Sequence, residues 1–316
     1  MDDAATLPSF FEPLLAQCYD ADDVRRIVEG CAVQRAVTLR ANTLKASSQQ
    51  VASQLGEAGV QWKGVSWYDD AFVIEGVRED RIRELPLYDQ GGVYLQSLSS
   101  MIPALVLDAQ PGEDIADLCA APGGKTTQIA ALTGGKAYIT ACEMHEPRAQ
   151  KLQHNLEKQG ARNVTVMRVD ARRLDDFFSF DRILVDAPCS GSGTLRAGDA
   201  KMFKRFTPQL IKKSQKAQQA LLSKALMLVR PGGTVVYSTC SVLRDENERI
   251  VEEALAHVPR SRSFELKPVV VGSAADGSAR IPQEMPVLPS ALEGALTVCP
   301  TELYEGFFVA KLHRIA

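Results

Sequence analysis

The sequence predicts a doubly wound α/β fold with a mostly parallel sheet, preceded by a small α+β domain. From residue 114 onward, short apolar runs alternate with longer runs of helical spacing, as in a parallel sheet covered by helices on both faces. Between residues 37 and 74 a shorter strand–helix–strand pattern stands alone. The turn formers Pro86, Gly91 and Gly92 separate the two regions. We therefore expect one domain over residues 1–92 and a larger one over residues 93–316.

In the amino-terminal region, apolar residues at helical intervals predict helical structure over residues 8–31. A strand at 37–40, an amphipathic helix at 47–56 and a second strand at 71–74 follow. Ser47 or Ser48 is the expected helix cap, because a serine side chain can accept from a free N–H group of the first turn. A further helix is expected at 97–107.

The larger domain alternates strands and helices. Strands are expected near 114–118, 137–142, 164–168, 182–186 and 233–238. Helices are expected near 125–132, 146–158, 209–229 and 246–256. Two late strands, at 262–266 and 306–312, are separated by a long Pro-rich loop.

The composition is that of an ordinary globular protein, with 45% hydrophobic and 24% charged residues in 316. No apolar run approaches the ~20 residues of a membrane span, and the amino terminus lacks the positive charge of a secretory signal. We therefore expect a cytoplasmic, monomeric enzyme without membrane contact. A net charge of −3 counts against a nucleic-acid partner. Basic runs at 196–205 and 212–216 count for one, although such runs usually form solvated surface.

The seven cysteines show no close pairing, which argues against a disulfide framework. The four histidines stand in no ligand spacing, so we expect no metal site. Most of the cysteines are expected to be small buried hydrophobic residues, namely Cys18, Cys31, Cys142 and Cys299.

Two cysteines stand apart from the others. Cys189 closes the sequence Asp-Ala-Pro-Cys, which is followed by Ser-Gly-Ser-Gly-Thr, and Cys240 lies in Tyr-Ser-Thr-Cys-Ser. Each follows a predicted strand, and catalytic groups of open α/β sheets gather past the carboxyl ends of strands. Two thiols at that edge indicate covalent chemistry.

A third segment, residues 117–126, reads Asp-Leu-Cys-Ala-Ala-Pro-Gly-Gly-Lys-Thr. It is not a P-loop, because Cys119 stands where the first glycine is required, and it is not a GxGxxG dinucleotide motif. A loop of small residues before a helix lets the backbone approach a cofactor closely. Acids follow the next strands, and together these features predict S-adenosylmethionine, although each acid alone could be a helix cap. The expected cofactor contacts are Cys119, Ala120, Ala121, Pro122, Gly123, Gly124, Lys125, Glu143, Asp170 and Asp186.

These three motifs in combination resemble those of the Nol/Nop/Sun-type RNA cytosine-5 methyltransferases, the RsmB/RsmF group. Segments at 39–43, 94–101 and 305–310 are also similar to family elements, so that the resemblance runs from about residue 36 to near the end. It implies a seven-stranded class I methyltransferase sheet and an RRM-like amino-terminal domain. Neither the NusB-like domain nor the PUA-like extension of other branches is found here.

The resemblance implies a catalytic set of Cys240, Cys189, Asp186 and Lys125. Cys240 would add to carbon 6 of cytosine, which makes carbon 5 nucleophilic enough to take the methyl group, and Cys189 would assist release. Asp186 could stabilise charge on the ring, with Lys125 beside it. DNA cytosine-5 methyltransferases use the Pro-Cys cysteine as nucleophile, so sequence context alone leaves the two cysteine roles open.

The expected substrate is a loop or flipped cytosine in structured RNA, with ribosomal RNA favoured over transfer RNA because the motifs are of bacterial type. Two alternatives remain. A DNA enzyme is disfavoured because no large insertion follows Pro-Cys, and a ribosome-assembly or RNA-binding factor is disfavoured by the intact catalytic set. Residues expected to hold phosphates are Arg40, Lys45, Arg196, Lys204 and Arg205.

Overall fold

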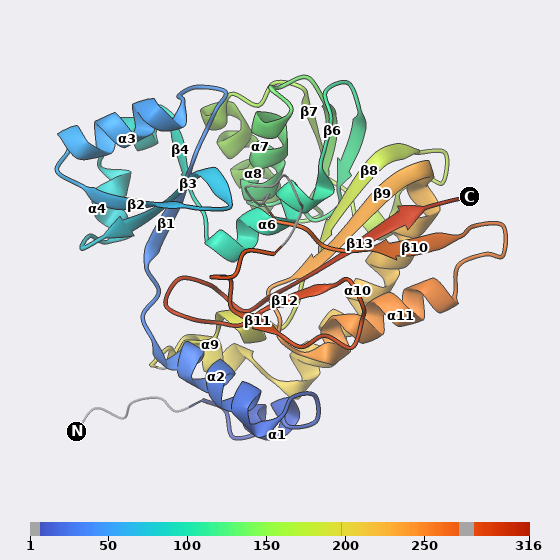
Figure 1. Cartoon of the computed structure of the whole chain (residues 1–316). Coiled ribbons are helices and arrows are strands. Elements are labelled where there is room, and N and C mark those ends of the chain that lie inside the picture. Colours follow the sequence, from blue (N-terminus) through green and yellow to red (C-terminus); the bar gives the residue numbers. More distant parts are fainter. Residues whose placement is uncertain (1–6, 197, 272–280) are drawn as a thin grey trace.

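The computed structural model describes residues 7–196, 198–271 and 281–316, which form two sheets and their covering helices (Figure 1). The main sheet has the order β11-β12-β13-β9-β8-β5-β6-β7, and β10 pairs with β13. Its strands are β5 (Asp114–Asp117), β6 (Tyr138–Cys142), β7 (Val164–Met167), β8 (Phe180–Asp186), β9 (Val229–Thr239), β10 (Phe264–Lys267), β11 (Val287–Leu288), β12 (Leu296–Val298) and β13 (Phe307–Arg314).

The five strands from β7 to β9 run parallel, and β13 joins β9 antiparallel. The expected doubly wound, class I methyltransferase arrangement is therefore confirmed. The sheet described here has nine strands, two more than the seven expected, because β11 and β12 pair within the loop that precedes β13. Residues 272–280 of that loop lie outside the described part of the chain.

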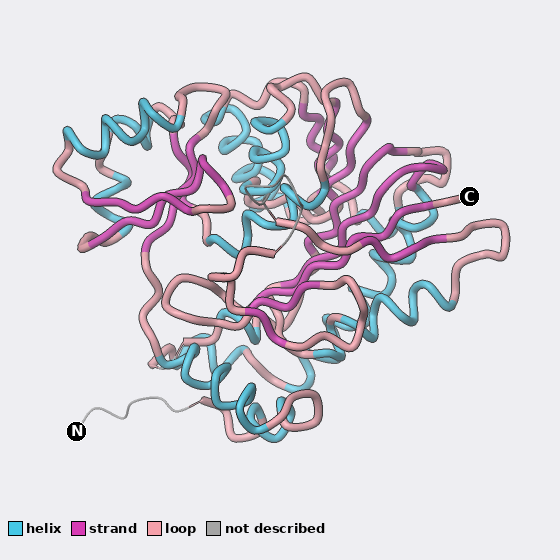
Figure 2. The backbone as a smooth tube through the Cα atoms, in the orientation of Figure 1, coloured by secondary structure: helices cyan, strands magenta, loops and turns pink. Residues whose placement is uncertain are grey.

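Helices cover both faces of this sheet, and the layers are easy to follow in the coloured tube of Figure 2. They are α6 (Leu98–Leu107), α7 (Gly124–Leu132), α8 (Glu146–Gln159), α10 (Pro208–Leu228) and α11 (Glu248–Ala256). The same part of the chain also contains the short helix α9 (Ala200–Arg205) and the 3₁₀ turns η1 (Ala171–Arg173), η2 (Ser192–Thr194) and η3 (Arg244–Glu246).

Alternation along the strands divides the core into two layers. In β8, Leu184 packs toward α6, α7 and α8, whereas Ile183 and Val185 pack toward α10 and α11. Neighbouring side chains of a strand point to opposite faces, so a parallel strand buried on both sides is apolar throughout. This packing holds the carboxyl ends of the strands at one edge.

The small domain is an antiparallel sheet of order β2-β3-β1-β4 with helices on one side. Its elements are β1 (Val37–Ala41), α3 (Ser48–Glu57), β2 (Gln61–Val65), β3 (Tyr68–Glu75), α4 (Glu79–Arg83), α5 (Pro86–Asp89) and β4 (Val93–Leu95). Ser47 caps α3, as expected, and Gln50 completes a capping box. The small sheet continues past the boundary expected at residue 92, because β4 pairs with β1.

Two further helices, α1 (Phe11–Leu15) and α2 (Ala21–Ala32), pack on the larger domain although they precede the small one in sequence (Figure 1). Phe11 and Ile27 share an apolar cluster with Phe206 and Val242. Gly30 permits this packing, since a Cβ there would lie 1.9 Å from the carbonyl oxygen of Pro300. None of the helices in the described residues combines the length and the apolarity required to cross a membrane.

Candidate active site

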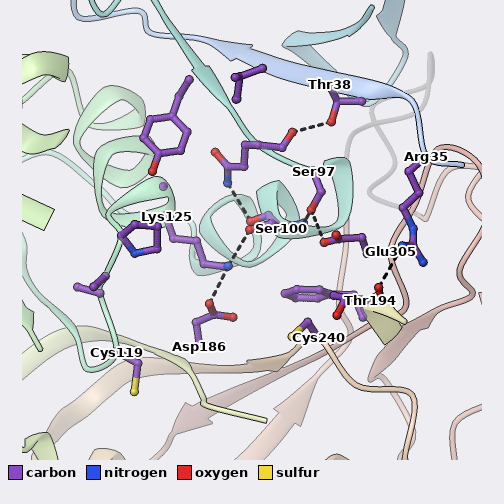
Figure 3. Close-up of a pocket in the computed structure, with 18 of the residues that line it drawn as sticks. Arg35, Thr38, Ser97, Ser100, Cys119, Lys125, Asp186, Thr194, Cys240 and Glu305 are labelled. Atoms are coloured by element: carbon purple, nitrogen blue, oxygen red, sulfur yellow. Dashed lines mark hydrogen bonds and ion pairs between the residues drawn. The ribbon is translucent and has the colours of Figure 1, made fainter. Parts of the chain in front are cut away.

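The carboxyl ends of β8 and β9 and the start of α7 bring the main polar groups together (Figure 3). Lys125 Nζ lies 2.7 Å from Asp186 Oδ2 and 2.7 Å from Ser100 Oγ. Ser238 Oγ donates to the other carboxylate oxygen of Asp186 at 2.9 Å. Asp186 is thus held from two sides, and Lys125 is paired with it instead of extending into solvent. The structure brings these two predicted residues together.

The two cysteines also meet. The Sγ atoms of Cys189 and Cys240 lie 3.0 Å apart, within hydrogen-bonding distance for sulfur. The hydrogen bond with Cys240, together with burial, raises the pKa of Cys189 well above its usual range. A raised pKa keeps the proton on Cys189, where it can be donated to the sulfur of Cys240.

Two cavities adjoin at Cys240. A pocket of about 430 Å³ is lined by Cys240, Lys125, Asp186 and Glu305, among other residues. A second cavity of about 280 Å³ is lined by both cysteines and by Asp186. Cys189 lines the second cavity, and Cys240 lines both. Any transfer of a group between molecules in the two cavities would pass beside Cys240.

The second cavity contains five of the predicted cofactor contacts: Cys119, Ala121, Glu143, Asp170 and Asp186. Ala120, Pro122, Gly124 and Lys125 line the larger pocket instead. Gly123 forms the turn into α7 with a φ of 109°, which L side chains rarely adopt.

The acids of the second cavity suit a ribose and a purine. Glu143 is buried; one carboxylate oxygen accepts from the N–H of His145 at 2.8 Å and the other lies 3.2 Å from Arg148. Asp170 caps η1 and binds the Arg172 guanidinium, which lowers the pKa of Asp170. Each carboxylate oxygen has two lone pairs, so capacity to accept from hydroxyl or amino groups remains. These residues fit S-adenosylmethionine.

Asp117 and Glu246 were not among the predicted site residues. Asp117 is fully buried at the start of the loop at residues 118–123 and accepts from Thr126 Oγ1 at 2.7 Å, and burial raises the pKa of Asp117 to about 6. Its place at the end of a strand was the available signal. It connects the loop to α7.

Glu246 joins the loops that follow the two cysteines. Its carboxylate accepts from the Ser190 N–H at 2.8 Å, from Ser190 Oγ at 2.5 Å and from Ser241 Oγ at 2.7 Å. The side chain is buried, which raises the pKa of Glu246. In the sequence it lies in a charged run, Arg-Asp-Glu-Asn-Glu, which reads as exposed surface.

The prediction that Arg40 binds phosphate is wrong. Arg40 is fully buried, and its guanidinium donates to Gln96, to Thr127 and to backbone carbonyls, because the register of β1 turns it toward α7. Lys45 is exposed, but its ammonium donates to the carbonyls of Gln90 and Lys158.

The other predicted phosphate contacts lie on the surface. Arg196 is exposed at the larger pocket, 3.9 Å from Glu305. Lys204 and Arg205 are exposed at the end of α9. Arg35, which was not predicted, lines the larger pocket and donates to the carbonyls of Gly193, Thr194 and Tyr304 (Figure 3). It supports the pocket wall.

The parallel sheet, the cavity beside its strand ends and the acids that line this cavity are those of a class I methyltransferase fold. A family model described as 16S rRNA methyltransferase RsmB/F matches residues 104–313. The chain belongs to this family, whose members depend on S-adenosylmethionine, and the resemblance noted from the three motifs is confirmed.

Two curated relatives illustrate the family. Ribosomal RNA small subunit methyltransferase F of Klebsiella pneumoniae is 38% identical over 232 residues, covering 72% of this chain and 46% of the relative. A tRNA (cytosine(72)-C(5))-methyltransferase of Pyrococcus horikoshii is 32% identical over 235 residues, covering 74% and 55%. The chain therefore spans about half the length of the curated relatives it matches.

Among solved structures, NSun6 from Pyrococcus horikoshii with SFG superposes with a TM-score of 0.83. The superposition covers 99% of both chains at 21% identity. The whole fold, including the small domain, is therefore shared.

Proposed function

We propose that this chain transfers a methyl group from S-adenosylmethionine to carbon 5 of a cytosine in structured RNA, with ribosomal RNA preferred to transfer RNA. The observation that carries the proposal is the position of Cys240 between the two cavities, with Cys189 3.0 Å away on the cofactor side. The preference for ribosomal RNA is supported by the family description and by the Klebsiella relative.

Cys240 is the nucleophile in this proposal. Cys189 Sγ lies 3.0 Å from Cys240 Sγ, so the Cys189 thiol is placed to donate a hydrogen bond to the attacking sulfur of Cys240. The thiolate forms a bond to carbon 6 of the cytosine, and the electron pair of the 5,6 double bond becomes available at carbon 5. When bound, S-adenosylmethionine supplies an electrophilic methyl group for that carbon.

In this proposal Lys125 stabilises the negative charge that develops on the cytosine ring, and Asp186 positions Lys125 and the base. As carbon 6 is attacked, negative charge spreads toward ring nitrogen 3, which an ammonium group can stabilise. Asp186 holds the ammonium of Lys125 at 2.7 Å and can accept from the exocyclic amine of cytosine. A matched donor and acceptor favour cytosine over uracil, which has a carbonyl oxygen in place of the amine.

Cys189 acts in the release step. Once Cys240 is bonded to carbon 6 it carries no negative charge, so one cause of the raised pKa of Cys189 is gone. Cys189 can then lose its proton to solvent and take the proton from carbon 5. The Cys240–carbon 6 bond breaks with its electron pair returning to sulfur, which regenerates the starting state of both thiols.

The test is transfer of tritium from methyl-labelled S-adenosylmethionine to purified small-subunit ribosomal RNA, transfer RNA and DNA from cells lacking the gene. Label in ribosomal RNA, mapped to a cytosine by bisulfite sequencing and lost in Cys240→Ala, supports the proposal. Label in DNA alone would favour the DNA enzyme. RNA binding without any label would favour an assembly factor. Cys18→Ala, at a half-buried cysteine beside α1, is the matched control and should retain activity.

A further inference from the structure

A third pocket, of about 210 Å³, lies where the small domain meets the carboxyl-terminal part of α8. Arg83, Lys151 and Lys158 supply cations to its wall, and Tyr88 and Tyr94 supply aromatic rings. Among the described residues, no acidic side chain lines this pocket. Positive charge with aromatic surface is the combination that binds single-stranded nucleic acid.

The positive charges here are only partly compensated. Glu79 pairs with Arg83 at 2.9 Å, and Asp89 reaches Lys158 only at 4.0 Å. Lys151 is exposed and has no ion pair within the described part of the chain. Burial lowers the pKa of Lys158. The charge of Asp89 opposes this shift, and the charges of Arg83 and Lys45 add to it. An anion in the pocket would relieve this repulsion.

The cationic groups are held in place by Tyr88. Arg83 donates to the Tyr88 hydroxyl at 2.7 Å, and its guanidinium carbon lies 5.4 Å from the centre of the ring. Lys158 Nζ lies 3.7 Å from the same ring centre. Cations over a tyrosine ring are attracted to its π face, so both groups have defined positions before any ligand binds.

The carboxyl end of α8 beside this pocket does not repel an anion, because its carbonyl groups already accept hydrogen bonds. A helix carboxyl terminus carries partial negative charge on its free carbonyls. Here Lys45 Nζ donates to the Lys158 carbonyl at 2.6 Å and Asn42 Nδ2 to the Gln159 carbonyl at 2.7 Å. The small domain can pack this closely against the end of α8 because residue 91 is glycine: a Cβ there would lie 2.0 Å from the Lys158 carbonyl oxygen. The carbonyls that would repel an anion are therefore already occupied.

The pocket adjoins the larger pocket that contains Cys240. Tyr94, Leu95 and Pro122 line both this pocket and the 430 Å³ pocket that contains Cys240. A strand whose base enters the larger pocket can therefore continue across Tyr94 toward Lys151 and Lys158.

We propose that this pocket binds a backbone phosphate of the substrate RNA strand, beside the nucleotide whose base reaches Cys240. The inference rests on the proposed function and assigns RNA-backbone binding to the small domain. It holds the strand by charge, without reading its sequence, together with α8. In this proposal the phosphate contact predicted for the buried Arg40 is made instead by Arg83, Lys151 and Lys158.

The experiment measures binding of a fluorescein-labelled oligocytidylate strand by anisotropy over a series of salt concentrations. We expect Lys151→Glu and Arg83→Gln each to weaken binding several-fold or more. The slope of log affinity against log salt should fall by roughly 0.7, the loss of one phosphate contact on a single strand. The matched control is Lys136→Glu, an exposed lysine before β6 that does not line the pocket, which should bind as the unaltered protein does.

The outcomes separate this inference from the proposed function. If the unaltered protein methylates RNA, and both variants bind and methylate as it does, the phosphate pocket is wrong and the proposed function stands. If Lys136→Glu weakens binding as much as Lys151→Glu, binding follows net charge and the pocket is also wrong. If the unaltered protein neither binds nor methylates RNA, both ideas fail. Calorimetric affinity for S-adenosylmethionine, expected to be unchanged in all variants, confirms that each remains folded.

Discussion

Cys189 and Cys240 approach within 3.0 Å at Sγ although 51 positions separate them, and each comes from the loop after a parallel strand. Their strands, β8 and β9, are neighbours in the sheet. Cys240 lines both cavities, and Cys189 lines the second one. This relationship leads to the first prediction.

Cys240→Ala should abolish methyl transfer and form no covalent RNA adduct, because no thiolate remains to attack carbon 6. Cys189→Ala should still attack and methylate but release slowly, which traps the protein on RNA as a species stable in denaturing gels. The double variant should lose the trapped species. Trapping by Cys240→Ala with none from Cys189→Ala would reverse the two roles.

Glu246→Ala should leave three buried donors of Ser190 and Ser241 without their acceptor, at a cost of about 1–3 kcal/mol in unfolding free energy each time a group is left unpaired. Because these serines directly follow Cys189 and Cys240, the distance between the two Sγ atoms should also become less well fixed. We expect slower adduct release than in the unaltered protein, measured by the decay of the trapped band.

Asp245→Ala is the matched control for that experiment, since Asp245 is an adjacent acid in a partly exposed pair with Arg249. It should change neither unfolding nor release. A Glu246→Ala protein that unfolds at lower denaturant but releases RNA at the normal rate would restrict Glu246 to a stabilising role.

Glu143→Ala should weaken S-adenosylmethionine binding about 10- to 100-fold by calorimetry, the loss of a hydrogen bond to a charged acceptor. The buried carboxylate lines the second cavity, and Arg148 beside it would lose its ion-pair partner. Glu146→Ala removes an exposed acid three positions further on, at the start of α8, and should leave the affinity unchanged. Equal affinities in the two variants would exclude Glu143 from the site.

Asp117 should make stability depend on pH. Burial raises the pKa of Asp117 to about 6, above the value of about 4 expected in the unfolded chain. Its contribution to folding is therefore fully present below pH of about 4 and is lost as the pH rises through 6. At about 1.4 kcal/mol per pKa unit, the change is roughly 3 kcal/mol.

The measurement is urea unfolding of the unaltered protein and Asp117→Asn between pH 4 and 7. The amide does not titrate and can still accept from Thr126. The stability of the unaltered protein relative to the variant should decrease across this range. A constant difference would show that Asp117 titrates normally.

Much of the larger domain could be predicted from local patterns. The expected strand at 114–118 corresponds to β5 (Asp114–Asp117), and the expected helix at 146–158 to α8 (Glu146–Gln159). The central parallel strands of the main sheet are buried on both faces, so each appears in the sequence as a continuous apolar run. Strand β2, by contrast, is mostly exposed and carries no such signal, and β11 and β12 are too short to have one.

The site shows the same division. Local sequence was enough to predict which loops supply the thiols and acids around the two cavities, because strand ends, small-residue loops and cysteines beside Pro, Gly, Ser and Thr are recognisable within a few residues. The partners of each polar side chain could be read only from the folded structure. Strand alternation does not say whether Arg40 turns toward solvent or toward α7, and a charged run does not say that Glu246 is buried. Those outcomes depend on packing between segments far apart in the chain, and packing is a property of the folded molecule.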